Sequence, residues 1–312
     1  MILRRIGIGI VMLWVVSVLV FAGTEILPGD AAQVMLGQNA TTATLAALRS
    51  ELGLDQPAYV RYVDWLGDMA SGDLGISKAG GATIESLIGN RLFNTVLLAA
   101  IVAGISVPLS IAIGLLAAMY PGSWIDRVVS FGTLSLISLP TFFTATILVL
   151  LFAVQLRWLP SVAYLSGDES LWKIARALAL PVLTLTIAVS GQLIRLTRAA
   201  VLNVVESPYI EMAILKGIPR RRIILRHALS NAIGPIVNVV ALNLAYLISG
   251  VVVVETVFAY PGLAKLMIDG VQTRDLPLVQ ACAMIFCGAY VVLILMADIV
   301  AIVSNPRLRH PR

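Results

Sequence analysis

Charged side chains are scarce in this chain. Asp, Glu, Lys and Arg together make up 12% of its 312 residues, whereas apolar residues make up 59%. A soluble protein of this length needs far more polar surface, so the composition indicates an integral membrane protein. The formal net charge of +5 is modest. The chain has no basic face with interleaved aromatic residues, which argues against nucleic acid and for a lipid bilayer as its partner.

Residues that could carry out catalysis are also scarce. The two histidines, His227 and His310, lie outside the apolar blocks, so an intramembrane serine nucleophile would have no base beside it. Glu255 and Asp298 belong to different blocks and are not expected to face each other. The chain contains no G-x-x-x-x-G-K-S/T phosphate loop and no cluster with metal-ligand spacing. We therefore expect a non-catalytic chain with no cofactor or metal of its own.

Cysteine is equally rare. Cys282 and Cys287 lie five residues apart in one apolar block. Small, weakly polar thiols are common in protein cores, so we expect packed side chains rather than a disulfide or a metal pair.

Six apolar blocks are long enough to cross a hydrocarbon core of about 30 Å as helices rising about 1.5 Å per residue. The predicted spans are residues 6–26, 95–119, 128–154, 178–200, 229–254 and 279–303. The first block follows Arg4 and Arg5, as a signal peptide would. Its apolar run of 18 residues is longer than a usual signal core. We expect it to be retained as the first helix.

The distribution of charge predicts the orientation. With both termini inside, the inner segments hold 13 of the 22 Lys and Arg residues but only three of the 17 acids. Basic residues accumulate in cytoplasmic loops, so this orientation fits and the reverse does not. We therefore predict a multi-pass membrane protein whose two termini are both cytoplasmic.

Three parts are expected along the chain: 1–26 as the first transmembrane helix, 27–94 as an extracytoplasmic segment, and 95–312 as a core with five spans. The segment 27–94 is too polar to lie in lipid and too short for a large domain. Within it we predict short helices over Thr41–Leu52 and Pro57–Met69. The second of these is expected to place on one side Tyr59, Tyr62, Val63 and Leu66.

The segment 206–229, ESPYIEMAILKGIPRRRIILRHAL, lies between two apolar blocks. Ser207 can cap a helix that Pro208 opens, and Gly217 can end it in a left-handed conformation. Pro219 can start a second short helix, whose first turn carries the basic cluster 220–222. This cluster predicts a cytoplasmic position. Two short helices at a membrane surface indicate a docking site for another protein, whereas the basic cluster alone would also suit anionic lipid headgroups.

The loop resembles that of a known family. Glu211-Met212-Ala213, with Gly217 four residues after the alanine, is similar to the E-A-A-x-x-x-G loop of ABC-importer permeases. Further motifs narrow the resemblance to the first of the two membrane subunits in the dipeptide/oligopeptide group. They are Leu27-Pro28-Gly29-Asp30, Glu51-Leu52-Gly53-Leu54-Asp55, Gly72-Asp73-Leu74-Gly75, Ser138-Leu139-Pro140-Thr141-Phe142, Trp158-Leu159-Pro160, Arg195-Leu196-Thr197-Arg198, the run from Glu255 to Leu263, Arg274-Asp275 and Asn305-Pro306-Arg307.

Their order and spacing extend the resemblance through nearly the whole chain. Mild departures from the family pattern occur at Met212, Ser230, Ala264 and Asn305. The resemblance does not identify the transported solute, because the group includes importers of peptides, glutathione, nickel chelates and some sugars.

The resemblance implies an all-α integral membrane protein with six transmembrane helices and the MetI-like ABC importer permease fold. It also implies that the helix 208–216 docks in a groove on a cytoplasmic ATPase. Small Ala213 would permit close approach, and Gly217 would permit the turn. The residues assigned to this coupling are Tyr209, Ile210, Glu211, Ala213, Ile214, Lys216, Gly217, Arg220 and Arg221.

A second set of residues is expected beside a translocation pathway or its gate: Ser138, Pro140, Phe142, Ser249, Gly250, Glu255 and Phe258. Proline in a spanning helix often marks a kink that faces protein or water, although tolerated packing explains Pro140 equally well. In the similar permeases the segment 249–258 lies beside the pathway. Glu255 also suits an ordinary interfacial carboxylate.

Asp298 is the acid placed deepest in the last span. An ionised group at mid-bilayer costs about 2.5–3.5 kcal/mol, and less near an end of the helix. We therefore expect Asp298 to face protein and to pair with Arg195 or Arg198.

Together these features predict a permease subunit of an ATP-driven, binding-protein-dependent importer in the bacterial inner membrane, with dipeptides or oligopeptides as the favoured solute. The resemblance implies a second homologous permease, two cytoplasmic ATPases that bind ATP and Mg²⁺, and an extracytoplasmic solute-binding protein. A standalone secondary transporter or channel is the alternative. It predicts internal repeats or a relay of buried charges, and the sequence shows neither.

Overall fold

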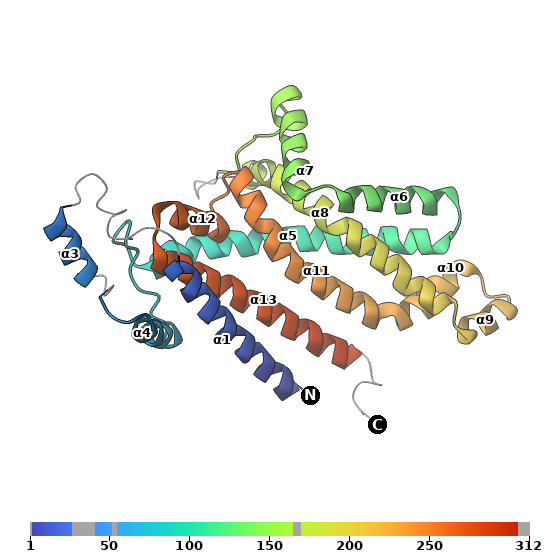
Figure 1. The fold of residues 1–312 in the computed structure, drawn as a ribbon. Helices are drawn as coiled ribbons and strands as arrows, with labels where there is room; N and C mark the ends of the chain where they lie inside the picture. The colour runs from blue at the N-terminus through green and yellow to red at the C-terminus, as the bar shows by residue number, and fades with distance from the viewer. Residues whose placement is uncertain (1, 27–40, 52–54, 165–169, 305–312) are drawn as a thin grey trace. The chain divides into compact units, whose positions relative to one another are not determined.

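A computed structural model describes residues 2–26, 41–51, 55–164 and 170–304. These residues form helices and turns, with one isolated bridge between Ile76 and Thr83. The elements in chain order (Figure 1) are α1 (Ile2–Ile26), α3 (Thr42–Glu51), α4 (Ala58–Ser71), α5 (Ile84–Met119), α6 (Trp124–Ser138), α7 (Thr141–Leu148), the π-helical η2 (Val149–Gln155), α8 (Leu171–Val205), α9 (Pro208–Leu215), α10 (Arg220–Arg222), the π-helical η3 (Ile223–Ala228), α11 (Leu229–Val257), α12 (Leu263–Thr273) and α13 (Leu276–Ser304). The predicted all-α fold is confirmed.

Among the described residues, five helical segments are long and apolar enough to cross a membrane. They are Arg4–Ile26, Ile84–Met119, Leu171–Val205, Arg220–Ile248 and Leu276–Val300. A sixth span is obtained when Trp124–Ser138 and Thr141–Gln155 are taken together. The six segments coincide with the six predicted apolar blocks.

The third block differs from a simple span because α6 and α7 meet at an angle of 101°. Pro140 has no N–H to continue a helix, and its ring disfavours a helical conformation at the residue before it. Leu139 is accordingly extended, with φ −88° and ψ 124°, and Pro140 follows with φ −60° and ψ 140°. Two consecutive extended residues produce a corner rather than the kink considered from the sequence. By contrast, Pro108, Pro181 and Pro235 lie inside helices.

The chain divides into two compact units. One, the N-terminal unit, comprises Met1–Thr95 and Pro261–Val291, and the other, the core unit, comprises Val96–Tyr260 and Val292–Arg312. The first division between the units falls between Thr95 and Val96, and residues 261–291 group with the N-terminal unit.

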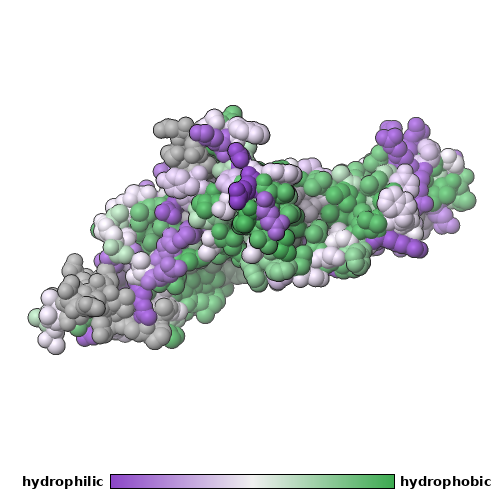
Figure 2. All heavy atoms as spheres, turned by 90° about the horizontal axis from the view of Figure 1, so that it is seen from above, coloured by the Kyte–Doolittle hydropathy of each residue, from purple (hydrophilic) through white to green (hydrophobic). Residues whose placement is uncertain are grey.

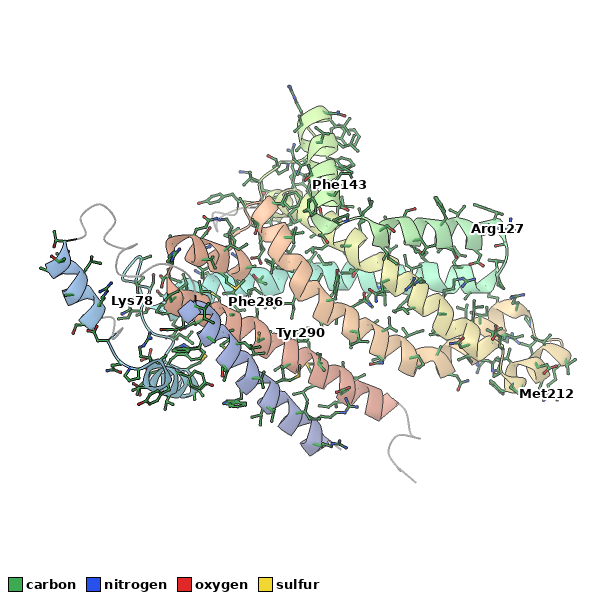
Figure 3. The ribbon with its side chains drawn as sticks, in the orientation of Figure 1. Lys78, Arg127, Phe143, Met212, Phe286 and Tyr290 are labelled. Carbon is green, nitrogen blue, oxygen red and sulfur yellow. The ribbon has the colours of Figure 1, made fainter. Side chains whose placement is uncertain are left out.

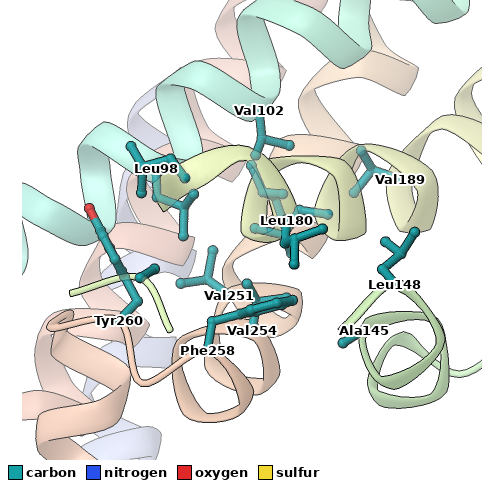
Figure 4. Close-up of a cluster of buried hydrophobic side chains, with 14 residues drawn as sticks. Leu98, Val102, Ala145, Leu148, Leu180, Val189, Val251, Val254, Phe258 and Tyr260 are labelled. Carbon is teal, nitrogen blue, oxygen red and sulfur yellow. The ribbon is translucent and has the colours of Figure 1, made fainter. Parts of the chain in front are cut away.

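In the core unit, α8 packs along α11, α6 and α7. The largest cluster of buried apolar side chains lies between α5, α7, α8 and α11 (Figure 4). Leu180 and Leu185 of α8 are fully buried there, together with Val251 and Val254 of α11. Phe258, at the end of α11, completes the same cluster.

Two glycines permit close contacts between helices of the core unit. A Cβ atom at Gly114 of α5 would lie 2.9 Å from the side chain of Thr197 on α8. A Cβ atom at Gly191 of α8 would lie 3.0 Å from the side chain of Ile137 on α6. Small residues at such positions let helix backbones approach, which is the usual device for packing helices in a membrane.

The N-terminal unit has its own core. The first turns of α5 pack against α12 and the start of α13, with the side chains of Ile84, Leu263 and Cys282 buried among them. Cys282 and Cys287 are both free thiols, as expected.

A buried carboxylate connects two of the motifs from the sequence. Asp275, the residue before α13, accepts a hydrogen bond of 2.5 Å from Ser77 Oγ and one of 3.1 Å from the Lys78 N–H. The Arg274-Asp275 motif is thereby joined to the loop that follows Gly72-Asp73-Leu74-Gly75. Two other motifs, 27–30 and 305–307, lie outside the described residues.

The surface of the core unit fits a membrane environment. Hydrophobic residues cover much of the face seen in Figure 2, and hydrophilic residues gather at the end that carries α9 and α10. Large apolar side chains such as Phe131 and Trp124 are about three-quarters exposed. Such exposure is unfavourable in water and favourable in lipid.

Candidate functional site

The helix α9 begins as the sequence predicts, with one difference. Ser207 occupies the residue before the helix and Pro208 its first position, where the missing N–H removes no helical hydrogen bond. The Ser207 side chain makes no capping hydrogen bond; its carbonyl instead accepts from the N–H of Ile210 at 2.9 Å. The helix start is therefore held by backbone bonds rather than by the predicted side-chain cap.

The end of α9 confirms the turn predicted at Gly217. This residue has φ +73°, in the left-handed region that glycine adopts without steric cost. Its N–H donates to the Ile214 carbonyl at 2.9 Å, and the Ile218 N–H donates to the Ala213 carbonyl at 3.2 Å. These two bonds define a Schellman motif, which satisfies the carbonyls left free at a helix end.

Two of the residues assigned to ATPase coupling lie on the inner side of α9. Ile210 and Ala213 are buried in a small cluster with Ile223, so they pack against the rest of this chain rather than facing outward. Small Ala213 permits close approach, but to the chain's own helices. Any contribution of these two residues to coupling is therefore indirect.

The outward side of α9 carries apolar residues that the sequence reasoning partly missed. Met212 and Leu215 are 55% and 74% exposed, and Met212 lies at the outer edge of the helix (Figure 3). Neither was assigned to the site. The other exposed candidates are Tyr209, Glu211, Ile214, Lys216, Arg220 and Arg221. Because PYIEMAIL is apolar almost throughout, its periodicity could not decide which side is buried.

The second short helix predicted after Pro219 does not stand alone. The three residues of α10 continue through the π-helical η3 into α11. Tyr209 Oη lies 2.8 Å from His227 Nδ1, which ties α9 to η3. Asn231 Nδ2 donates to the His227 carbonyl at 2.8 Å. The segment is therefore one short helix attached to the base of a long one, and a displacement of α9 would act directly on α11.

The predicted pathway residues differ widely in exposure. Ser138, Pro140 and Phe142 are exposed at the α6–α7 corner, where Ser138 Oγ donates to the Leu134 carbonyl at 2.9 Å. Glu255 and Phe258 are fully buried at the end of α11. Ser249 lies on α11, but its side chain is outside the described residues.

Gly250, also on α11, is a packing position. A Cβ atom there would lie 3.1 Å from Leu185 Cδ2 on α8. The structure therefore does not bring the predicted pathway residues together on one surface of this chain.

The end of α11 is a second left-handed turn. Ala259 has φ +48°, and the Tyr260 N–H donates to the Glu255 carbonyl at 2.9 Å. The Phe258 carbonyl accepts from the Ala163 N–H at 2.8 Å, which fixes the turn to the segment before α8. Burial, together with the nearby Glu255 carboxylate, raises the pKa of Tyr260 to about 12.

Of the two arginines expected to pair with Asp298, Arg198 pairs with another carboxylate, and a pair with Arg195 stays a prediction. The Arg198 guanidinium binds Asp126 at the start of α6 with two hydrogen bonds, Nε to Oδ1 at 2.6 Å and Nη2 to Oδ2 at 2.8 Å. Asp126 Oδ2 also accepts from the Gly122 N–H at 2.9 Å. A bidentate pair of this kind is strong and directional. It joins α6 to α8 beside a cavity of about 180 Å³ that Arg195 also lines.

No group of three or more His, Cys, Asp or Glu residues in the described part of the chain could hold a metal ion. The geometry is that of a helical membrane protein with the short helix α9 exposed at one end of the core unit.

This arrangement defines a class, the membrane-spanning subunits of transport complexes. Residues 110–310 match the family model of the binding-protein-dependent transport system inner membrane component, and residues 1–103 match the model of its N-terminal part. The chain belongs to this family of multi-pass inner membrane permeases, which work with ATPase and binding-protein components.

Curated relatives agree with this assignment. A probable peptide ABC transporter permease protein, y4tP, of Sinorhizobium fredii is 34% identical over 309 residues, covering 99% of each chain. The glutathione transport system permease protein GsiC of Escherichia coli K12 is 34% identical over 307 residues, covering 98% of this chain and 97% of its own. The resemblance inferred from the motifs is confirmed, and the standalone transporter finds no support.

Proposed function

We propose that this chain forms half of a translocation pathway for short peptides, with a second, homologous permease as the other half. Two cytoplasmic ATPases bind ATP and Mg²⁺, and an extracytoplasmic binding protein delivers the solute. The chain itself binds no cofactor and catalyses no reaction. Both of its termini are cytoplasmic, because this orientation places the basic segment 206–229 inside. Peptides are favoured as solute because y4tP is named a probable peptide permease and GsiC a glutathione transport permease, and glutathione is itself a tripeptide.

The observation that supports the coupling role best is the two-sided construction of α9. Its inner residues, Ile210 and Ala213, are buried against the base of α8 and η3. Its outer residues, Met212 and Leu215, are apolar and exposed at the end of the bundle where hydrophilic residues gather. An exposed apolar patch with a polar rim is typical of a protein interface. Glu211, Lys216 and Arg220 supply that rim.

In the proposed cycle, ATP binding closes the ATPases and moves α9. The turn at Gly217 and the Tyr209–His227 contact transmit this movement to η3 and α11. The Asp126–Arg198 pair and the close α6–α8 contact at Gly191 hold α8 to α6, so these two helices move together. The permease is thereby biased towards one orientation of the pathway, and hydrolysis resets it.

The first test is isolation of the tagged chain from its host in mild detergent, followed by mass spectrometry. A second permease and P-loop ATPases are expected to copurify. The purified complex is then placed in vesicles and tested for ATP-dependent uptake of labelled dipeptides, tripeptides and glutathione. Uptake by this chain alone would contradict the proposal in favour of a standalone transporter.

Variants of α9 test the docking surface separately from the solute. Leu215→Asp is expected to abolish ATPase copurification because it places an unpaired charge in an apolar contact. Leu171→Asp is a matched control, since Leu171 is an exposed leucine at the start of the 35-residue helix α8, whose other end precedes α9. Equal loss in both variants would indicate general damage to the fold rather than a docking site.

A further inference from the structure

The helix α4 carries an apolar surface that the transport function does not account for. Tyr59 and Val63 are 73% and 63% exposed, and Ala70 is exposed on the same side. With about 100° of rotation per residue, Tyr59, Val63, Leu66 and Ala70 project within a narrow sector of the helix. None of the residues of α4 is buried.

A second side of α4 contacts α1 in the same unit. Arg61 forms an ion pair with Glu25 near the C-terminal end of α1. The Tyr62 and Trp65 rings lie 5.4 and 5.8 Å from the ring of Phe21. Tyr62 Oη lies 2.8 Å from Oγ of Ser17, which is fully buried. The sequence predicted one side of this helix that carries Tyr59, Tyr62, Val63 and Leu66. The structure separates these residues, because Tyr62 faces α1 whereas Tyr59 and Val63 are exposed.

These contacts set the depth of α4 along a membrane-spanning helix. Ser17 precedes Ile26 by nine residues, which corresponds to about 13 Å of helix. The apolar span is Arg4–Ile26. A Tyr62 side chain that reaches Ser17 therefore extends below the membrane surface at the C-terminal end of α1. The segment was expected to be too polar to lie in lipid, whereas this contact with α1 points to a deeper position for α4.

The orientation of α4 agrees with this depth. In Figure 1, α4 is seen nearly end-on while α1 runs across the picture, so the two axes cross at a steep angle. A helix that crosses a spanning helix steeply lies close to the plane of the membrane. The acidic residues Asp64 and Asp68 project on the side of α4 roughly opposite the middle of the apolar sector. One side thus meets α1, one is apolar, and one is acidic.

We propose that α4 is an interfacial helix, embedded in the membrane surface at the C-terminal end of α1. Tyr59 and Val63 enter the boundary between headgroups and acyl chains, and Asp64 and Asp68 face water. Because the polar side is acidic, attachment depends on apolar burial and on the contact with α1 rather than on attraction to anionic lipid. The inference holds for either orientation of the chain and does not depend on the identity of the solute.

The test uses nitroxide spin labels on the full-length chain, in its complex and in nanodiscs of zwitterionic lipid. Single cysteines are introduced as Tyr59→Cys, Val63→Cys, Asp64→Cys and Asp68→Cys, with Cys282→Ala and Cys287→Ala as background. All four labelled positions are exposed, so folding should be preserved. ATP-driven uptake confirms that each labelled complex is intact. The measurement is the accessibility of each label to dissolved oxygen, which enters lipid, and to a water-soluble nickel chelate.

The oxygen-to-nickel accessibility ratio is expected to be several-fold higher at positions 59 and 63 than at 64 and 68. High nickel accessibility at all four positions would show a helix in water and overturn the proposal. Protection of positions 59 and 63 from both reagents would also overturn it, because a protein partner, such as the second permease, would then cover this side.

Discussion

Two helix ends in the core unit have the same backbone hydrogen bonds but different residues at the turn. α9 ends at Gly217 with φ +73°, and α11 ends at Ala259 with φ +48°. In each, the N–H three residues beyond the last helical residue donates to a carbonyl five residues earlier, Ile218 to Ala213 and Tyr260 to Glu255. Both turns are therefore Schellman motifs, and only one has the glycine that favours this conformation.

The surroundings explain the difference. A Cβ atom at Gly217 would meet nothing within 4 Å, so only the backbone conformation favours glycine there. Ala259 stands between Phe258 and Tyr260, which are both fully buried. A left-handed alanine costs about 1 kcal/mol, and the burial of two aromatic side chains exceeds this cost. The turn at Gly217 depends on its residue type, whereas the turn at Ala259, itself exposed, can be held by its two buried neighbours.

The largest expected effect comes from removing the buried Phe258 side chain beside the turn at Ala259. Phe258→Ala should lower the free energy of unfolding by about 3–5 kcal/mol, because it leaves a cavity in the cluster shared by α8 and α11. Thermal unfolding of the purified complex, followed by circular dichroism, measures this loss. Val257→Ala is the matched control, since Val257 is 40% exposed. If both variants melted alike, packing would not be what holds the turn at Ala259.

Alkaline pH offers a second way to weaken the same turn. The pKa of Tyr260 is raised to about 12 by burial and by Glu255, whereas an unfolded tyrosine ionises near pH 10. The unfolded state therefore releases this proton first, and stability falls as pH rises from about 10 to about 12. Two pKa units correspond to about 2–3 kcal/mol at the alkaline limit.

Tyr260→Phe should remove this component of the pH dependence. The measurement is the difference in melting temperature between wild type and variant, from neutral pH upward. The wild type is expected to lose more stability than the variant only above about pH 10. Parallel curves over the whole range would show that Tyr260 titrates normally in the folded chain.

Features of the fold and of the site that neighbouring residues determine could be predicted from the sequence, whereas features that distant segments determine could not. Gly217 was predicted correctly, because a glycine between a short helix and a proline points to a left-handed turn. The spans were predicted from the lengths of the apolar runs. The turn at Ala259 was not, because alanine carries no such signal and the packing that holds it comes from distant segments.

The same distinction explains the remaining differences. Pro140 produces a corner, whereas Pro108 lies inside a helix, so proline alone does not determine the outcome. Arg198, one of the two arginines considered as partners of Asp298, pairs instead with Asp126, which is 72 residues away. On α9 the nearly uniform apolar sequence hid the fact that Ile210 is buried and Met212 is exposed.

At the turn after α9, a side chain in place of Gly217 should be harmful only because it strains the backbone. Gly217→Val is expected to destabilise the turn by about 1–2 kcal/mol, because a β-branched residue is strained at positive φ. The change should lower ATPase copurification and uptake while leaving the melting temperature of the bundle nearly unchanged. Gly217→Asn should be tolerated better, since asparagine adopts this conformation more readily. Equal effects of Val and Asn would point to a contact with the partner rather than to strain.

The smallest expected effect is a gain, from Ala259→Gly. The substitution removes the strain of a left-handed alanine, about 1 kcal/mol, but a glycine also increases the entropy of the unfolded chain by a comparable amount. The net change should therefore be a stabilisation of less than about 1 kcal/mol, in contrast to the loss expected for Gly217→Ala at the other turn. Chemical unfolding of Ala259→Gly, Gly217→Ala and wild type measures the gain and the loss in the free energy of unfolding in one experiment. A loss at Ala259 as large as that at Gly217 would mean that the alanine methyl group itself contributes to packing, and that this turn also depends on its residue type.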